Sequence, residues 1–131
     1  MKKILIIEDD ADTADILILA LTKSYTLSVI NNTIHLMEKM NEFLPDLIIT
    51  DNFVGQKVAA EIIKEIRSED RFNYIPVILF SAHPDIHKLS IEIAAAAYIT
   101  KPFTLQYLNS SIEKVLASPA VMKEVTGNIS A

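Results

Sequence analysis

Residues 4–12 read ILIIEDDAD, four apolar residues followed at once by three acids and, after Ala11, by a fourth. Unbroken rather than alternating hydrophobicity is typical of a strand that is buried on both faces, as in a parallel sheet. Similar short runs recur as LSVI at 27–30, LIIT at 47–50, VILF at 77–80 and YIT at 98–100. The sequence therefore predicts a parallel sheet covered on both sides.

Segments with helical spacing separate these runs. Apolar residues recur every three or four positions between the strands, and the first such segment, about 12–23, is apolar almost all round its middle. Thr33, Pro84 and Thr104 are predicted to open the second, fourth and last helices, and Pro45 to end the second. The expected order is strand and then helix, five times over, which is an α/β doubly wound fold.

The length of 131 residues suits one domain, which we expect at 1–117, with a short C-terminal tail at 118–131. Half of the residues are hydrophobic and 22% are charged, so the chain can bury a core of good size. The net charge of −5 argues against binding to nucleic acid or to an anionic membrane and favours a protein partner.

The chain has no cysteine, which excludes disulfides, thiolate metal sites and cysteine nucleophiles. The run ILII ends at Glu8, short of the ~7–15 apolar residues of a signal peptide. No apolar run approaches the ~18 residues of a membrane span. We expect a cytoplasmic protein that does not insert into membranes.

Polar side chains follow four of the five predicted strands: Glu8, Asp9 and Asp10, then Asp51, Ser81 and Lys101. Ligands of open α/β sheets bind at the carboxyl ends of the strands. Taken singly, each residue has an ordinary explanation: the acids favour the start of a helix, Asp51 is a turn residue, Ser81 a loop hydroxyl and Lys101 a solvated charge. Their combination at one sheet edge favours a site instead.

Carboxylates from separate strands suit Mg²⁺, which takes oxygen ligands at ~2.0–2.1 Å and keeps several waters. Crowded carboxylates repel one another, and a divalent ion relieves that cost. The sequence therefore predicts a cation at the end of the first strand.

Four motifs, ILIIEDD, PDLIITD, VILFSA and YITKPF, resemble in order and spacing the receiver domains of two-component response regulators. The resemblance covers about residues 2–117. It implies a flavodoxin-like (βα)5 three-layer sandwich with a parallel five-stranded sheet in the order 2-1-3-4-5. It also implies a single-domain regulator of the chemotaxis or phosphorelay kind, a signalling protein and not an enzyme.

Carried over residue by residue, the resemblance implies that Asp51 accepts a phosphoryl group from a sensor histidine kinase or a histidine phosphotransfer protein. The remaining roles that it implies are Mg²⁺ binding by Glu8, Asp9, Asp51 and the backbone carbonyl of Phe53, phosphoryl binding by Ser81 and Lys101, switching by Ser81 and Tyr98, and a cis-proline at Pro102. Receiver domains often pair through the fourth helix, fifth strand and fifth helix, which leaves a homodimer open. The protein effector is not identified.

Two departures from the family pattern concern loops. The stretch NFVGQKVAAE after Asp51 lacks the usual Pro and Asp-Gly, and AAAAY lacks the glycine that often precedes the switch aromatic. Phe53, bulky and apolar, stands two residues past the acceptor, and we expect it to slow an attacking water.

Three other interpretations remain. A small aspartyl-phosphate phosphatase would need a second acid two residues past Asp51, where this chain has Phe53. A nucleotide- or flavin-binding module would need a glycine-rich phosphate loop, but the chain has only two glycines. A receiver-like module that binds partners without being phosphorylated is not excluded by the loop departures.

Overall fold

The apolar runs form one parallel sheet in the computed structural model, which describes residues 1–118. Its strands are β1 (Lys3–Ile7), β2 (Thr26–Ile30), β3 (Leu47–Thr50), β6 (Val77–Ser81) and β7 (Ala97–Thr100). They lie in the order β2-β1-β3-β6-β7, and every neighbouring pair is parallel. Because β6 and β7 are the fourth and fifth strands of this sheet, the predicted order 2-1-3-4-5 is confirmed.

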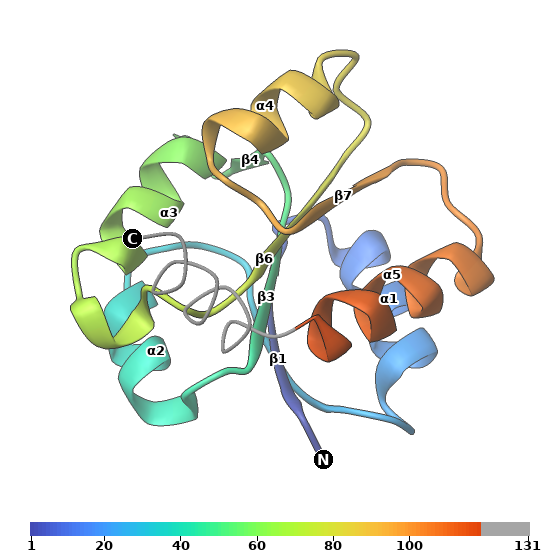
Figure 1. Cartoon of the computed structure of the whole chain (residues 1–131), viewed down its shortest axis with the longest axis horizontal. Coiled ribbons are helices and arrows are strands. Elements are labelled where there is room, and N and C mark those ends of the chain that lie inside the picture. The colour runs from blue at the N-terminus through green and yellow to red at the C-terminus, as the bar shows by residue number, and fades with distance from the viewer. Residues whose placement is uncertain (119–131) are drawn as a thin grey trace, which may run out of the picture.

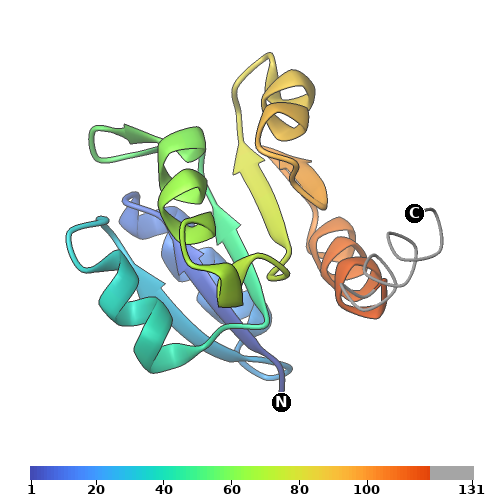
Figure 2. The ribbon, with the colours of Figure 1, turned by 60° about the vertical axis from the view of Figure 1, so that its left-hand side comes forward.

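Helices cover both faces of the sheet (Figure 1). They are α1 (Ala11–Leu21), α2 (Leu36–Phe43), α3 (Ala59–Arg67), α4 (Ile86–Glu92) and α5 (Leu105–Ala117), with a 3₁₀ turn η1 at Asp70–Phe72. α1 and α5 lie on one side, and α2 and α3 lie on the other, in front of the sheet in Figure 2. The arrangement is a three-layer (βα)5 sandwich, as predicted.

Two covered faces explain why the strands read as unbroken apolar runs. Ile4 and Ile6 pack toward α1 and α5, whereas Leu5 and Ile7, between them in sequence, pack toward α2 and α3. All four are fully buried. Burying one such side chain contributes about 1.5–3 kcal/mol relative to its exposed state, so each face needs its own apolar set.

The helix starts differ in part from the prediction. α2 begins at Leu36 behind His35, so Thr33 is not its N-cap. The side chain of Asn32 accepts a hydrogen bond from the amide of Ile34 at 3.0 Å, and this local turn takes up the residues ahead of the helix. Thr104 caps α5 as predicted, because its hydroxyl accepts a bond from the amide of Tyr107 at 3.0 Å.

α4 begins at Ile86, with Asp85 as its N-cap, so Pro84 precedes the helix and does not open it. The imidazole Nδ1 of His83 accepts a hydrogen bond from the amide of Asp85 at 3.0 Å, which forms a turn across the proline. At the other end of α2, Leu44 adopts a left-handed backbone with φ 52°, and Pro45 then prevents the helix from continuing.

The segment after β3 contains a short antiparallel hairpin that the sequence did not predict, formed by β4 (Phe53–Val54) and β5 (Lys57–Val58). Gly55 turns this hairpin with φ +62°. The hairpin leads directly into α3, and the amide of Ala59 donates to the carbonyl of Asn52 at 2.7 Å. This segment therefore has a defined shape and lies directly after Asp51.

No helix within residues 1–118 is long and apolar enough to cross a membrane. The C-terminal tail expected at 118–131 lies, apart from Ser118, outside the described residues.

Candidate functional site

Strand register brings the acids of two strands together. β1 and β3 are neighbours, and Ile7 pairs with Thr50, so the residues that follow each strand emerge side by side. The amide of Asp51 donates to the carbonyl of Ile7 at 3.2 Å, which extends this alignment by one residue. Glu8 and Asp51 are 43 residues apart in sequence but adjacent in space because of this parallel pairing.

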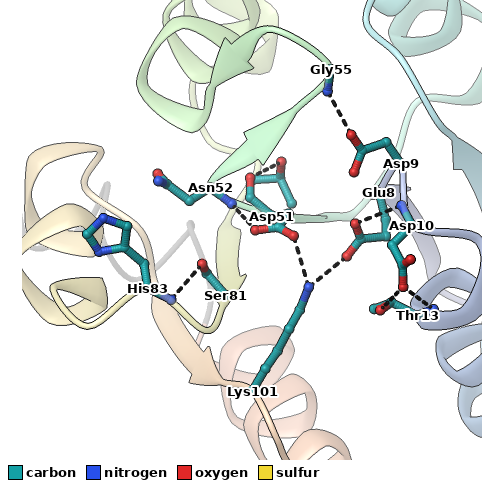
Figure 3. Close-up of polar contacts among 11 residues, drawn as sticks. Glu8, Asp9, Asp10, Thr13, Asp51, Asn52, Gly55, Ser81, His83 and Lys101 are labelled. Carbon is teal, nitrogen blue, oxygen red and sulfur yellow. Dashed lines mark hydrogen bonds and ion pairs between the residues drawn. The ribbon is translucent and has the colours of Figure 1, made fainter.

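Lys101 lies between these two acids (Figure 3). Its Nζ is 3.0 Å from Oε1 of Glu8 and 2.9 Å from Oδ2 of Asp51. The lysine follows β7, its amide donates to the carbonyl of Ser81 at 3.0 Å, and the peptide bond to Pro102 is cis. One ammonium group therefore pairs with carboxylates from two different strands.

Burial perturbs both partners of the Glu8–Lys101 pair. The Glu8 side chain is only 2% exposed, and this burial raises its pKa above the usual 4.5, although the bonds from Lys101 and from the Asp10 amide oppose the rise. For Lys101, burial by itself lowers the pKa, but its bonds to Asp51 and Glu8 outweigh burial and raise the pKa above 10.5. Lys101 thus holds a positive charge against Asp51 at neutral pH.

The three consecutive acids have three different partners. The Asp9 side chain reaches toward the hairpin, and its Oδ2 accepts a hydrogen bond from the amide of Gly55 at 3.0 Å (Figure 3). Asp10 caps α1 through the amide of Thr13 at 2.9 Å and its hydroxyl at 2.6 Å, and these bonds lower the pKa of Asp10. The ordinary explanation, an acid at a helix start, thus applies to Asp10.

Asp51, Ser81 and Lys101 line one open cavity of about 530 Å³, together with Asn52, Phe53, Val58, Ala82 and His83. Glu8 and Asp9 line a different cavity of about 670 Å³, between α1 on one side and the end of β2 and α2 on the other. The structure therefore gathers the Asp51 carboxylate, the Ser81 hydroxyl and the Lys101 ammonium at one cavity, whereas Asp9 lines another.

Ser81 and Tyr98 belong to different environments. The Ser81 hydroxyl is buried and accepts a hydrogen bond from the amide of His83 at 3.1 Å, and its own hydrogen has no acceptor among residues 1–118. Tyr98 packs with Leu79 and Ile86, and its ring lies against that of His87 with centroids 5.4 Å apart. Sequence reasoning missed this contact because His87 belongs to α4 and Tyr98 to β7, and no local pattern predicts how these two elements pack.

The donor chemistry at the strand ends fits Mg²⁺ in part. Glu8, Asp9 and Asp51 supply carboxylate oxygens and Phe53 a backbone carbonyl, all hard ligands of the type that Mg²⁺ prefers. Among the described residues, no three acidic or imidazole side chains are gathered as a metal cluster. Three such side chains are not required, since Mg²⁺ usually takes one or two carboxylates and retains waters.

Residues 4–113 match the response regulator receiver domain family. The chain belongs to this family. Receiver domains are modules of two-component signalling and are generally non-catalytic.

Two curated relatives show how receivers occur in longer proteins. The sensor histidine kinase TmoS of Ectopseudomonas mendocina is 27% identical over a region that covers 95% of this chain and 13% of TmoS. The phosphate regulon transcriptional regulatory protein PhoB of Escherichia coli is 28% identical, with 95% of this chain and 56% of PhoB covered. This receiver thus spans less than two thirds of either relative.

Among solved structures, a putative response regulator from Chloroflexus aurantiacus superposes with a TM-score of 0.81 at 25% identity, covering 88% of this chain and 98% of that one. The shared fold therefore includes nearly all of that chain.

Proposed function

We propose that Asp51 of this receiver domain accepts a phosphoryl group from a histidine kinase or a histidine phosphotransfer protein, in a reaction that needs Mg²⁺. The observation that carries the proposal is the bridge from Lys101 to Asp51 and Glu8, at 2.9 and 3.0 Å. A fixed cation beside a carboxylate at an open cavity is what an acceptor needs, because it neutralises charge on the incoming group.

In the proposed transfer, a carboxylate oxygen of Asp51 forms a bond to phosphorus as the bond from phosphorus to the donor imidazole nitrogen breaks. That nitrogen keeps the electron pair. Phosphoryl transfer depends mainly on positioning and on charge stabilisation. Lys101 supplies a cation for the equatorial oxygens, and Mg²⁺, held by Asp9, Asp51, the Phe53 carbonyl and Glu8 through water, would supply a second positive charge.

The signal would be a population shift between two arrangements of the region around β6 and β7. The free hydrogen of the Ser81 hydroxyl can donate to a phosphoryl oxygen, and Tyr98 would follow as Ser81 moves. The output surface would be α4, β7 and α5, on which Ile91, Leu105 and Tyr107 are exposed. An effector protein, or a second copy of this chain, would bind there.

One observation favours a second candidate, a receiver that works without phosphorylation. Lys101 already satisfies Asp51, and Asp9 is bonded to the hairpin, so a stable site could persist with neither metal nor phosphoryl group. The phosphatase alternative is less well supported, because the residue two positions after Asp51 is Phe53, which cannot act as a general acid.

Thermal unfolding with and without Mg²⁺ and beryllofluoride, which mimics the aspartyl phosphate, tests the proposal. The wild type and Asp51→Asn would be compared, since the amide keeps the shape of the side chain but removes its charge. A rise in Tm that needs both additives and disappears in Asp51→Asn supports phosphoryl acceptance, because a ligand that binds only the folded state raises Tm.

No rise in either protein would overturn the proposal and favour the phosphorylation-independent receiver. As a specificity control, Asp12→Asn removes an acid from the exposed side of α1 and should leave the response unchanged. A positive result would then be extended by incubation with a phosphorylated histidine phosphotransfer protein and mass analysis of Asp51.

A further inference from the structure

The hairpin after Asp51 contacts the first strand end through one backbone bond. The amide of Gly55 donates to Oδ2 of Asp9 at 3.0 Å across a sequence separation of 46 residues. The loop from Asn52 to Lys57 contains no proline, so each of its residues keeps an amide hydrogen that can donate. The bond therefore depends on the loop sequence of this chain. It links two segments that lie far apart in sequence.

Glycine is suited to this position by its backbone and not by lack of space. Its φ of +62° lies in the left-handed region, which residues with a side chain adopt only at a cost. A Cβ placed there would have no heavy atom within 4 Å. The conformation points the amide at Asp9, and any effect of a substitution would arise from that conformation.

We propose that the Gly55 amide positions the Asp9 carboxylate for Mg²⁺, so that the β4–β5 hairpin is part of the metal site. This inference rests on the proposed function, which assigns Asp9 to the metal. The bond occupies Oδ2 and limits rotation of the carboxylate, while Oδ1 accepts no hydrogen bond from any other described residue and remains available as a ligand. Bonds of this kind orient metal ligands, and their loss typically weakens metal binding about 10–100-fold.

The same hairpin carries a second proposed ligand. Phe53 forms the first residue of β4 and pairs with Val58, so its backbone is held by the hairpin that Gly55 turns. Asp9 and the Phe53 carbonyl are thereby coupled through a segment of a few residues. Because coupling between a ligand and a conformation is reciprocal, Mg²⁺ should in turn stabilise the hairpin.

Three substitutions separate the role of the Gly55 conformation from general strain. Gly55→Val places a β-branched residue at positive φ, which is strongly disfavoured, whereas Gly55→Asn tolerates the left-handed region and keeps the amide donor. Ala94→Val is the matched control, since Ala94 has φ 51° and is also exposed but lies after α4. Both variants place valine at a similar positive φ on an exposed segment, and only Gly55→Val would affect Asp9.

Isothermal calorimetry with MgCl₂ alone measures the affinity without any phosphoryl donor. We expect Gly55→Val to raise the Kd about 10-fold, and Gly55→Asn and Ala94→Val to stay within about twofold of the wild type. Thermal unfolding without Mg²⁺ identifies any variant that fails to fold, in which case Gly55→Ala replaces Gly55→Val. Equal affinities in the wild type and in the folded variant would overturn the inference and leave the proposed function standing.

Hydrogen exchange of the Gly55 amide gives a second readout that a purely structural role would not change. Mg²⁺ should slow exchange at Gly55 in the wild type, because the ion holds the carboxylate that accepts this hydrogen. Faster exchange would mean that Mg²⁺ draws Asp9 away from the hairpin, and unchanged exchange would mean that the ion does not act on this bond. Either result contradicts positioning. A wild type that binds no Mg²⁺ would overturn the inference and the proposed function together.

Discussion

Replacing Lys101 by methionine should destabilise the fold even without any phosphoryl chemistry. The substitution keeps an unbranched apolar stem, which can still pack on Phe80, whose ring centroid is 4.8 Å from Nζ in the native structure. It removes the charge that pairs with Glu8 and Asp51. Glu8 is 2% exposed, so it would be left as a buried carboxylate without its partner.

The size of the loss follows from how deeply the pair is buried. Removing one partner of a fully buried pair costs about 3–5 kcal/mol, whereas exposed pairs contribute about 0–1 kcal/mol. Glu8 is buried, but Lys101 is 21% exposed, and solvent there weakens the interaction. We therefore expect Lys101→Met to lower the free energy of unfolding by about 2 kcal/mol and Tm by about 7 °C.

The stability that Lys101→Met loses should depend on pH through the protonation of Glu8. Its pKa in the folded protein lies above the unfolded value near 4.5, so the stability due to its protonation is full below pH 4.5 and is lost as the pH rises through the raised pKa. Loss of Lys101 removes a bond that lowers this pKa and therefore raises it further. The difference in the free energy of unfolding between Lys101→Met and the wild type should be largest at neutral pH and should decrease on acidification.

Urea unfolding followed by circular dichroism at pH 7 and pH 5 measures these differences. Lys57→Met is the matched control, because Lys57 pairs with Glu65 at 3.4 Å with side chains 42% and 38% exposed, and it should cost well under 1 kcal/mol. The double variant Glu8→Gln/Lys101→Met should regain most of the loss at pH 7. If Lys101→Met were as stable as Lys57→Met, or if Glu8→Gln did not restore stability, the buried charge would not be the cause.

Three further outcomes are expected. Asp10→Ala should fray the first turn of α1 and speed hydrogen exchange at the Thr13 amide, and unchanged exchange at pH 7 would refute the cap. Because the Asp10 pKa is lowered below 3.8, the cap stabilises the helix above that pH and fails as the pH falls through the lowered pKa. Burial, and then the charge of Glu113, raise the pKa of Tyr25 above 10, so Tyr25→Phe should remove a late-titrating phenol from the absorbance at high pH. An unaltered late part of the titration in this variant would contradict the assignment. Phe53 is 56% exposed at the cavity that Asp51 also lines, and Phe53→Asn should shorten the lifetime of the proposed phosphoryl group on Asp51, measured by loss of label. An equal half-life would show that Phe53 does not exclude water.

The strands and most of the helices could be predicted from the sequence because their signals are local. Runs such as ILII and VILF are unbroken since each side chain meets one of two helical layers. The start of α2 could not be located in this way. Thr33 and Asn32 are both good turn-forming and capping residues, and the turn made by Asn32 with Ile34 took precedence.

The hairpin at β4 and β5 was missed because strands of two residues carry almost no periodic signal. Gly55 was the one available indication, as the only glycine between Met1 and Ser118, and its positive φ explains its presence. The contact between the His87 and Tyr98 rings had no such indication, since it depends on how α4 lies against β7.

The sequence by itself determined the order of the elements and the types of residue at the strand ends, because hydropathy and chain order are properties of short segments. Only the tertiary structure decided what each acid does. Glu8, Asp9 and Asp10 are consecutive and chemically alike, yet one pairs with Lys101, one accepts from Gly55 and one caps α1. Successive residues beyond a strand point in different directions, and their partners lie on segments that strand register and crossovers bring alongside.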